Sequence, residues 1–114
     1  MDTEELVTLA MTIQCIPSPT LDEHDRADYL RNEFSRAGLQ DVQIDSAGNT
    51  LGRIGDSADP AILVSAHMDS IFPRDAVRPA ERDGNRLKGP GIGDNALGVA
   101  ALIGLARELP SMSL

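Results

Sequence analysis

The spacing of apolar residues predicts two amphipathic helices in the first third of the chain. The first helix is capped by Asp2 and ends before Pro17. The second begins in a capping box over residues 20–23 and stops at Gly38. Their apolar residues recur every three or four positions: Leu6, Leu9, Ala10 and Ile13 in the first helix, and Ala27, Leu30, Phe34 and Ala37 in the second. We therefore expect each helix to pack through one face.

The middle of the chain has the pattern of short strands. Residues 42–45 alternate between apolar and polar, and residues 50–54 follow a turn at 46–49, which predicts an antiparallel hairpin. Residues 56–60 are expected to form a loop. The continuous apolar run 61–64 predicts a strand that is buried on both faces.

The last third combines a glycine-rich loop with a third helix. A short hairpin is compatible with residues 83–85, and residues 89–93 form a tight loop. Asp94 then opens a helix that runs to about Leu109, and every residue from 96 to 106 is apolar or glycine. A helix that is apolar all round is normally covered on all sides. We therefore expect the chain to be the front portion of a larger α/β domain.

Composition and charge exclude several classes of protein. The 114 residues include 18 acids and 10 bases, a net charge of −8, which argues against binding to nucleic acid or to an anionic membrane surface. No apolar run approaches the length of a membrane helix, and the acidic N-terminus does not resemble a secretory signal. The single cysteine, Cys15, is expected to be a buried, inert thiol. These features predict a cytoplasmic protein.

Three side chains in the second half of the chain could hold a metal ion. His67 and Asp69 follow the predicted strand 61–64, and Asp94 lies at the start of the third helix. In open α/β sheets, sites form beyond the carboxyl ends of the strands. His67 could supply a ring nitrogen, and Asp69, two residues on, could accept a hydrogen bond from the other ring nitrogen. Each carboxylate oxygen of Asp94 could bind a separate cation.

Other candidate sites are weaker. The loop 89–93 superficially resembles a phosphate-binding loop, but the negative charge of Asp94 at the helix N-terminus would repel phosphate. Cys15 lacks a neighbouring base that would activate a nucleophile. His24 is expected on the solvated surface. The five bases of residues 74–88 are expected in a solvated loop, with binding of a substrate carboxylate as the alternative.

At these residues the sequence resembles the co-catalytic zinc exopeptidases. The resemblance rests on the segments 65–73 and 89–101, and it extends with less detail from Leu6 to Leu109. The most similar group is metallopeptidase family twenty, which includes peptidase T, acetylornithine deacetylase, succinyl-diaminopimelate desuccinylase and aminoacylase. The pair Asp94-Asn95 also resembles neighbouring aminopeptidase families of the same fold. The fold implied is a three-layer α/β/α sandwich with a mixed sheet.

The resemblance implies a role for each of the three side chains. His67 would bind one zinc ion, Asp94 would bridge two, often with a cis bond to Asn95, and Asp69 would be the catalytic carboxylate that orients His67. Cobalt or manganese could replace zinc. A hydroxide held between the ions would attack the amide carbonyl of a small peptide or an N-acyl amino acid. The sequence shows no other cofactor-binding motif.

The same resemblance implies parts that this chain lacks. The general base of the family is the first residue of a Glu-Glu pair downstream of the bridging Asp, and further ligands follow. After Asp94 the only acid is Glu108, about 21 Å away along a helix, and there is no His. We therefore expect residues 1–114 to be the N-terminal part of a catalytic domain, without its remainder or its lid and dimerisation domain.

Two functional hypotheses follow. In the first, the parent protein is a two-zinc peptidase or amidohydrolase, in some cases a homodimer, and this chain alone is inactive. In the alternative, the chain is a truncated, catalytically incomplete fragment or a non-catalytic interaction unit of the same fold.

Overall fold

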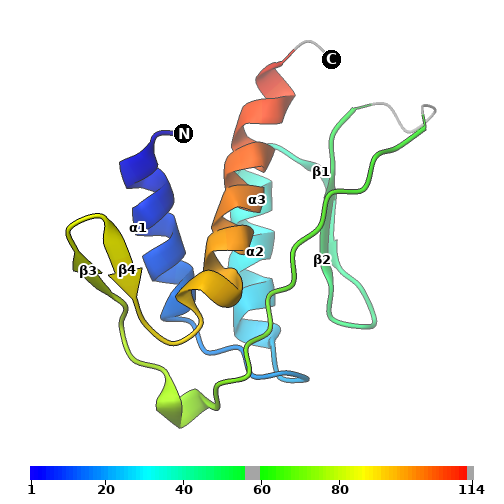
Figure 1. Cartoon of the computed structure of the whole chain (residues 1–114). Helices are drawn as coiled ribbons and strands as arrows, with labels where there is room; N and C mark the ends of the chain where they lie inside the picture. Colours follow the sequence, from blue (N-terminus) through cyan, green and yellow to red (C-terminus); the bar gives the residue numbers. More distant parts are fainter. Residues whose placement is uncertain (56–59, 113–114) are drawn as a thin grey trace.

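The described part of the chain folds into three α-helices and two small antiparallel sheets (Figure 1). The computed structural model describes residues 1–55 and 60–112, so most of the loop predicted at 56–60 lies outside the described residues. The helices are α1 (Thr3–Gln14), α2 (His24–Arg36) and α3 (Leu97–Glu108). Strand β1 (Gln40–Ile44) pairs with β2 (Thr50–Arg53), and β3 (Glu81–Asp83) pairs with β4 (Arg86–Lys88). This is an α/β structure, as the sequence predicts.

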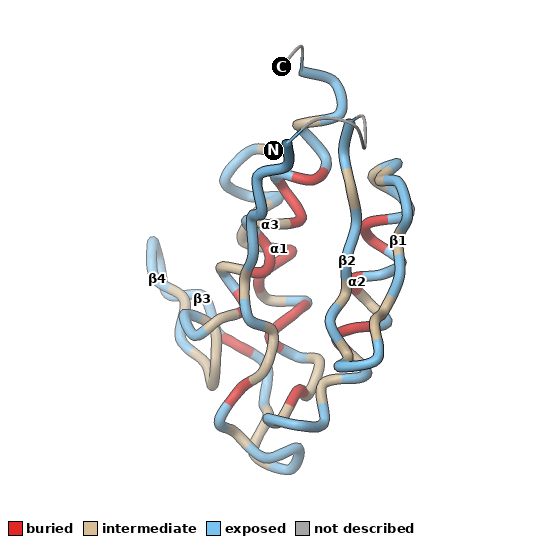
Figure 2. The backbone as a smooth tube through the Cα atoms, turned by 90° about the vertical axis from the view of Figure 1, so that its right-hand side faces the viewer, coloured by how far each residue is buried: buried red, intermediate tan, exposed pale blue. Residues whose placement is uncertain are grey.

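The hydrophobic core lies between the three helices. Helix α3 contacts both α1 and α2, and α2 also contacts β1 and β2. Figure 2 shows the buried residues concentrated along the helices, whereas the hairpins are mostly exposed or partly exposed. The core consists of Leu9, Ala10, Ile13, Leu30, Phe34, Ala96, Val99, Ala100, Ile103 and Ala106. None of the described helices is long and apolar enough to cross a membrane.

Helix α1 starts at the predicted cap and ends before Pro17 as predicted, but the residue after it differs from the prediction. The Asp2 carboxylate accepts a hydrogen bond from the Glu5 backbone N–H at 2.8 Å, which caps the helix as expected. Cys15 is exposed, so the predicted burial of its thiol is wrong. The physical reason is its position at the end of the helix, off the face that buries Leu9 and Ile13.

Helix α2 begins later than the sequence predicts. Its first residue is His24, and the capping box over residues 20–23 does not form. Leu21 adopts a left-handed backbone conformation with φ of +72°, and the Thr20 hydroxyl bonds to Asp69 rather than to the helix. At the other end, Gly38 has φ of +82° directly after the helix, which confirms the predicted stop.

The largest difference from the prediction concerns the apolar run 61–64. It forms neither a strand nor a buried segment: Ile62 is 91% exposed and Leu63 is 84% exposed. The two sheets of the described residues are separate, and neither pairs with this run. Without neighbouring strands, the backbone has no ladder to join and the side chains have no surface to cover them. The mixed sheet and the three layers therefore stay predictions.

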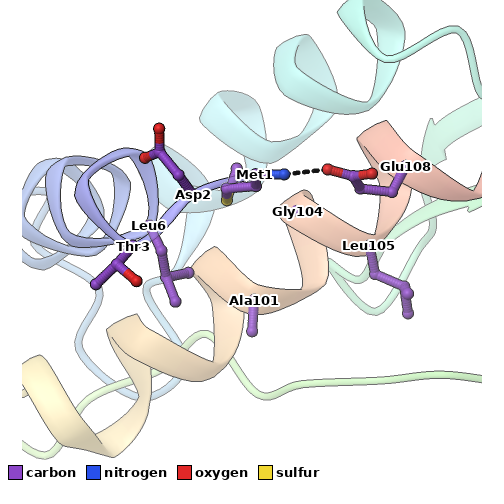
Figure 3. A pocket seen from close by; sticks show the side chains of 8 residues that line it. All are labelled: Met1, Asp2, Thr3, Leu6, Ala101, Gly104, Leu105 and Glu108. Atoms are coloured by element: carbon purple, nitrogen blue, oxygen red, sulfur yellow. Dashed lines mark hydrogen bonds and ion pairs between the residues drawn. The ribbon is translucent and has the colours of Figure 1, made fainter.

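The expectation that α3 lacks cover on its second face agrees with the structure. Leu97 and Leu105, two turns apart, are 44% and 38% exposed, and Ala101 between them is also exposed. Ala101 and Leu105 line a hollow of about 530 Å³ between the start of α1 and α3. Figure 3 shows the side chains around it. The N-terminal ammonium group and Glu108 form an ion pair at its edge.

Gln14, at the end of α1, fastens the β3–β4 hairpin to the core. Its side chain is completely buried. The amide nitrogen donates to the carbonyl oxygens of Arg78 and Pro90 at 2.8 and 2.9 Å, and the amide oxygen accepts from the Ala80 backbone N–H at 2.9 Å. One side chain thus ties both ends of the hairpin to α1, and it positions the loop 89–93 that leads to Asp94.

The two faces of α3 should respond differently to truncation. Ile103→Ala should lower the free energy of unfolding by roughly 2–5 kcal/mol, because Ile103 is fully buried. Leu105→Ala on the outer face should cost less than about 1 kcal/mol. Urea unfolding of both variants measures the difference. Equal losses would contradict a one-sided burial of α3.

Removal of the Gln14 amide should destabilise the fold although the volume hardly changes. Gln14→Leu leaves up to three backbone groups without partners, at roughly 1–3 kcal/mol for each group that stays buried. The matched control Gln43→Leu, at an exposed strand position, should stay within about 0.5 kcal/mol of the original chain. Equal unfolding midpoints for both variants in urea would refute the role assigned to Gln14.

Candidate metal centre

His67 and Asp69 lie on a segment that is held against the loop between α1 and α2. Pro19 and Ser70 form an isolated parallel bridge. The Ser70 N–H donates to the carbonyl of Ser18 at 2.7 Å, and the Thr20 N–H donates to the carbonyl of Ser70 at 3.3 Å. These bonds place the predicted His-x-Asp segment beside a loop that lies some fifty positions earlier in the chain.

The three predicted side chains converge. The His67 ring lies between two carboxylates: its Nδ1 atom is 3.2 Å from Oδ1 of Asp69, and its Nε2 atom is 2.9 Å from Oδ1 of Asp94. The contact with Asp69 has the geometry expected for two residues on the same side of an extended segment. The Asp94 side chain is 76% exposed, so the place where Nε2 and the carboxylate meet is accessible to solvent.

Asp94 is carried by an irregular turn directly before α3. The turn spans Ile92–Ala96, so the regular helix starts at Leu97 rather than at Asp94 as predicted. The backbone angles of Asp94 and Asn95 are not helical, and the bond between them is cis, the conformation that the resemblance implies there. The turn aims the Asp94 carboxylate at His67 instead of along the helix axis.

Asn95 connects this turn to the segment of His67. Its side-chain nitrogen donates to the backbone carbonyl of His67 at 3.0 Å. A Cβ atom at position 98 would overlap the Asn95 amide, so Gly98 leaves the space that this side chain occupies. The Asn95 hydrogen bond was not predicted from the sequence, although the pair Asp94-Asn95 was singled out as a motif.

Asp69 accepts hydrogen bonds on both of its oxygens. The Thr20 hydroxyl donates to Oδ2 at 2.7 Å, and Oδ1 faces His67. The hydrogen bond from Thr20, followed by the one from His67, lowers the pKa of the Asp69 carboxyl below its ordinary value. Asp69 is therefore held as a carboxylate that can accept from the imidazole.

Arg26, on α2, connects the segment of His67 and Asp69 to the loop after α1. Its side chain is almost fully buried, and it donates from Nε to the Ile16 carbonyl at 2.8 Å and from Nη1 to the Met68 carbonyl at 2.9 Å. Burial lowers the pKa of the guanidinium, and the nearby charge of Asp69 opposes this effect. The sequence offered no signal for this role, because Arg26 stands in a charged stretch that reads as a solvated helix surface.

The other polar residues considered in the sequence lie elsewhere. His24 is on the surface, as expected, between the carboxylates of Asp22 and Asp25. The same two carboxylates hold Arg74, each at 2.9 Å. Arg82 pairs with Glu4 of α1. These two arginines are thus engaged within the chain, which weakens the alternative that they hold a substrate carboxylate.

The nitrogen and oxygen atoms around His67 could be ligands of a cation. When Nδ1 donates its hydrogen to Asp69, the Nε2 atom of a neutral ring presents a lone pair to Asp94 Oδ1 at 2.9 Å. Two such acceptors are complementary only if a second proton or a metal ion lies between them. Two ligand atoms of a tetrahedral zinc ion lie roughly 3.3 Å apart, given bonds of about 2.0–2.1 Å. Nε2 and Oδ1 lie 2.9 Å apart, so they would have to separate slightly to hold the ion.

The fit is partial. Within residues 1–55 and 60–112, no three His, Cys, Asp or Glu side chains group closely enough to hold a metal ion together. Asp69 faces Nδ1 and Thr20 rather than the space between Nε2 and Asp94. The described residues therefore provide two ligands, fewer than the three that a catalytic zinc ion takes from a protein.

The chain is similar to known proteins over most of its length. The chain is 26% identical over 106 residues to the uncharacterized protein YgeY of Escherichia coli strain K12, and equally to YgeY of Escherichia coli O157:H7. The similarity covers 87% of this chain but 26% of each relative, so the chain spans about a quarter of the length of the curated relatives it matches.

A family model identifies the group more closely. The model described as peptidase family M28 matches residues 49–113, more than half of the chain, and this range includes His67, Asp69 and Asp94. The match agrees with the co-catalytic superfamily that the sequence resembles, while the narrower assignment to family twenty stays a prediction. The chain belongs to peptidase family M28.

Proposed function

We propose that this chain is the N-terminal part of the catalytic domain of a zinc-dependent hydrolase. The observation that carries the proposal is the convergence of His67 Nε2 and Asp94 Oδ1, 2.9 Å apart, within the range matched by a peptidase family. The substrates would be small peptides or N-acyl amino acids. The whole protein would act in the cytoplasm and could form a homodimer. We expect neither nucleic acid nor a membrane as its partner.

Each of the three residues has a role in this proposal. His67 would bind one ion through Nε2, and Asp94 would bind through its carboxylate and bridge to a second ion. Asp69 would accept the Nδ1–H of His67 and so keep Nε2 free for the metal. Two zinc ions, when bound, would supply Lewis acidity to the substrate carbonyl and lower the pKa of water. Nitrogen and oxygen ligands also suit cobalt or manganese, so the choice of zinc rests on the resemblance.

The resemblance to family twenty, beside the match to family M28, extends from Leu6 to Leu109. Family twenty contains both peptidases and N-acyl amidohydrolases, so we propose an amide bond as the target and leave both substrate classes open. The general base and the remaining ligands would come from outside residues 1–114.

A second candidate function follows from the incomplete ligand set. The chain on its own would be a non-catalytic unit of this fold, because its described residues bring together two candidate ligands and no candidate general base. Glu108, the only acid after Asp94, forms its ion pair with the N-terminal ammonium group at the far end of α3. Its carboxylate is therefore not available to the site.

Cobalt titration of the 114-residue chain tests the metal ligands. The chain should bind Co²⁺, and its visible absorption bands should report nitrogen and oxygen ligands. His67→Ala and Asp94→Ala should each weaken binding by roughly tenfold or more, because each removes one of two ligands. The matched control His24→Ala removes a surface histidine that also lies between two carboxylates, and it should bind like the original chain.

Two outcomes would contradict the proposal. Equal Co²⁺ affinity in His67→Ala, Asp94→Ala and the original chain would refute the ligand assignment, provided that circular dichroism shows all three folded. Metal-dependent hydrolysis of a dipeptide or an N-acetyl amino acid by the 114-residue chain alone would refute the expectation that it lacks essential parts.

A further inference from the structure

We propose that Thr20 is a positioning residue for the metal ligand His67, and that it acts through Asp69. The inference rests on the proposed function, since it concerns the orientation of a ligand named there. It is carried by a chain of three contacts that runs from the Thr20 hydroxyl through both Asp69 oxygens and both ring nitrogens of His67 to Asp94.

The first contact determines how the Asp69 carboxylate is turned. Thr20 Oγ1 donates to Oδ2 at 2.7 Å, the short distance typical of a hydroxyl bonded to a charged acceptor. The second oxygen, Oδ1, is left for His67 Nδ1 at 3.2 Å. An aspartate side chain that is held through one oxygen can still turn about both Cα–Cβ and Cβ–Cγ. With both oxygens engaged, the χ1 rotamer and the carboxylate plane of Asp69 are set, and so is the ring that bonds to it.

The backbone on both sides of this contact is tied down. The Thr20 N–H bonds to the Ser70 carbonyl, and the Ser70 N–H bonds to the Ser18 carbonyl. The buried Arg26 guanidinium bonds to the carbonyls of Ile16 and Met68, one from each segment. The separation between the Thr20 and Asp69 backbones is therefore determined by these four hydrogen bonds. The Thr20 hydroxyl is therefore already within hydrogen-bonding distance of the Asp69 carboxylate.

The Thr20 side chain has little other structural role. It is exposed, it lies outside the core, and the helix cap that its sequence context suggests does not form. Loss of its hydroxyl should therefore affect the orientation of Asp69 and His67 far more than the stability of the fold.

Three variants separate positioning from structure. Thr20→Val keeps the shape and removes the donor, Thr20→Ser keeps the donor, and Thr12→Val removes an exposed hydroxyl that bonds to the Thr8 carbonyl far along α1. Thr20→Val should weaken Co²⁺ binding by roughly three- to tenfold, somewhat below the usual effect of a residue that bonds directly to a metal-bound His. Thr20→Ser should restore the affinity, Thr12→Val should leave it unchanged, and all three should keep the unfolding midpoint in urea.

A second measurement needs no metal. Three-bond χ1 couplings of Asp69 in the metal-free chain should report a single rotamer in the original chain and in Thr20→Ser. In Thr20→Val they should report rotamer averaging. A Thr20→Val chain that keeps both the single rotamer and the original Co²⁺ affinity would overturn the positioning role.

The two measurements distinguish the failure of each proposal. Normal Co²⁺ binding by the original chain, lost in His67→Ala but unaffected in Thr20→Val, would refute Thr20 alone. Absent Co²⁺ binding by the original chain would refute the proposed metal ligands, and the χ1 couplings would then decide whether Thr20 orients Asp69. Failure of Thr20→Ser to restore the single rotamer would show that the methyl group, not the hydroxyl, holds the loop.

Discussion

The inner face of α3 is the surface on which α1 and α2 both pack, and the elements that carry the site residues are arranged around it. Val99, Ala100 and Ile103 are almost fully buried there, which sets the axis of the helix relative to the other two. Because Asp94 precedes α3 by three positions, the same packing determines where its carboxylate emerges. The loop between α1 and α2 is positioned by the same core, and this loop carries Thr20 to the segment of His67 and Asp69.

Two buried polar side chains hold the loops around the candidate site in place. Gln14 bonds to three backbone groups at the ends of the β3–β4 hairpin, and Arg26 bonds to carbonyls of the two segments that flank the site. Both side chains are almost completely removed from water, where an unmade hydrogen bond is costly. They therefore specify loop positions that hydrophobic packing, which has no direction, would leave open.

Exposed apolar residues of the described fold lie on both sides of the candidate site. The apolar run 61–64 is exposed directly before His67, and the outer face of α3 is exposed directly after Asp94. The two protein ligands thus lie where two uncovered apolar surfaces meet the solvent. A domain that covered these surfaces would also bring new side chains close to His67 and Asp94, which is consistent with a ligand set that is completed from elsewhere.

Local patterns in the sequence were sufficient for much of the secondary structure and for the three residues of the candidate site. Helical periodicity, the Asp2 cap and the Gly38 stop act over a few residues, and the His-x-Asp spacing places His67 beside Asp69. Only the tertiary structure decided the start of α2, the exposure of 61–64 and the roles of Thr20, Gln14, Arg26 and Asn95. Each of these depends on a partner 10 to 76 positions away or on a missing neighbouring strand, and a local pattern carries no information about either.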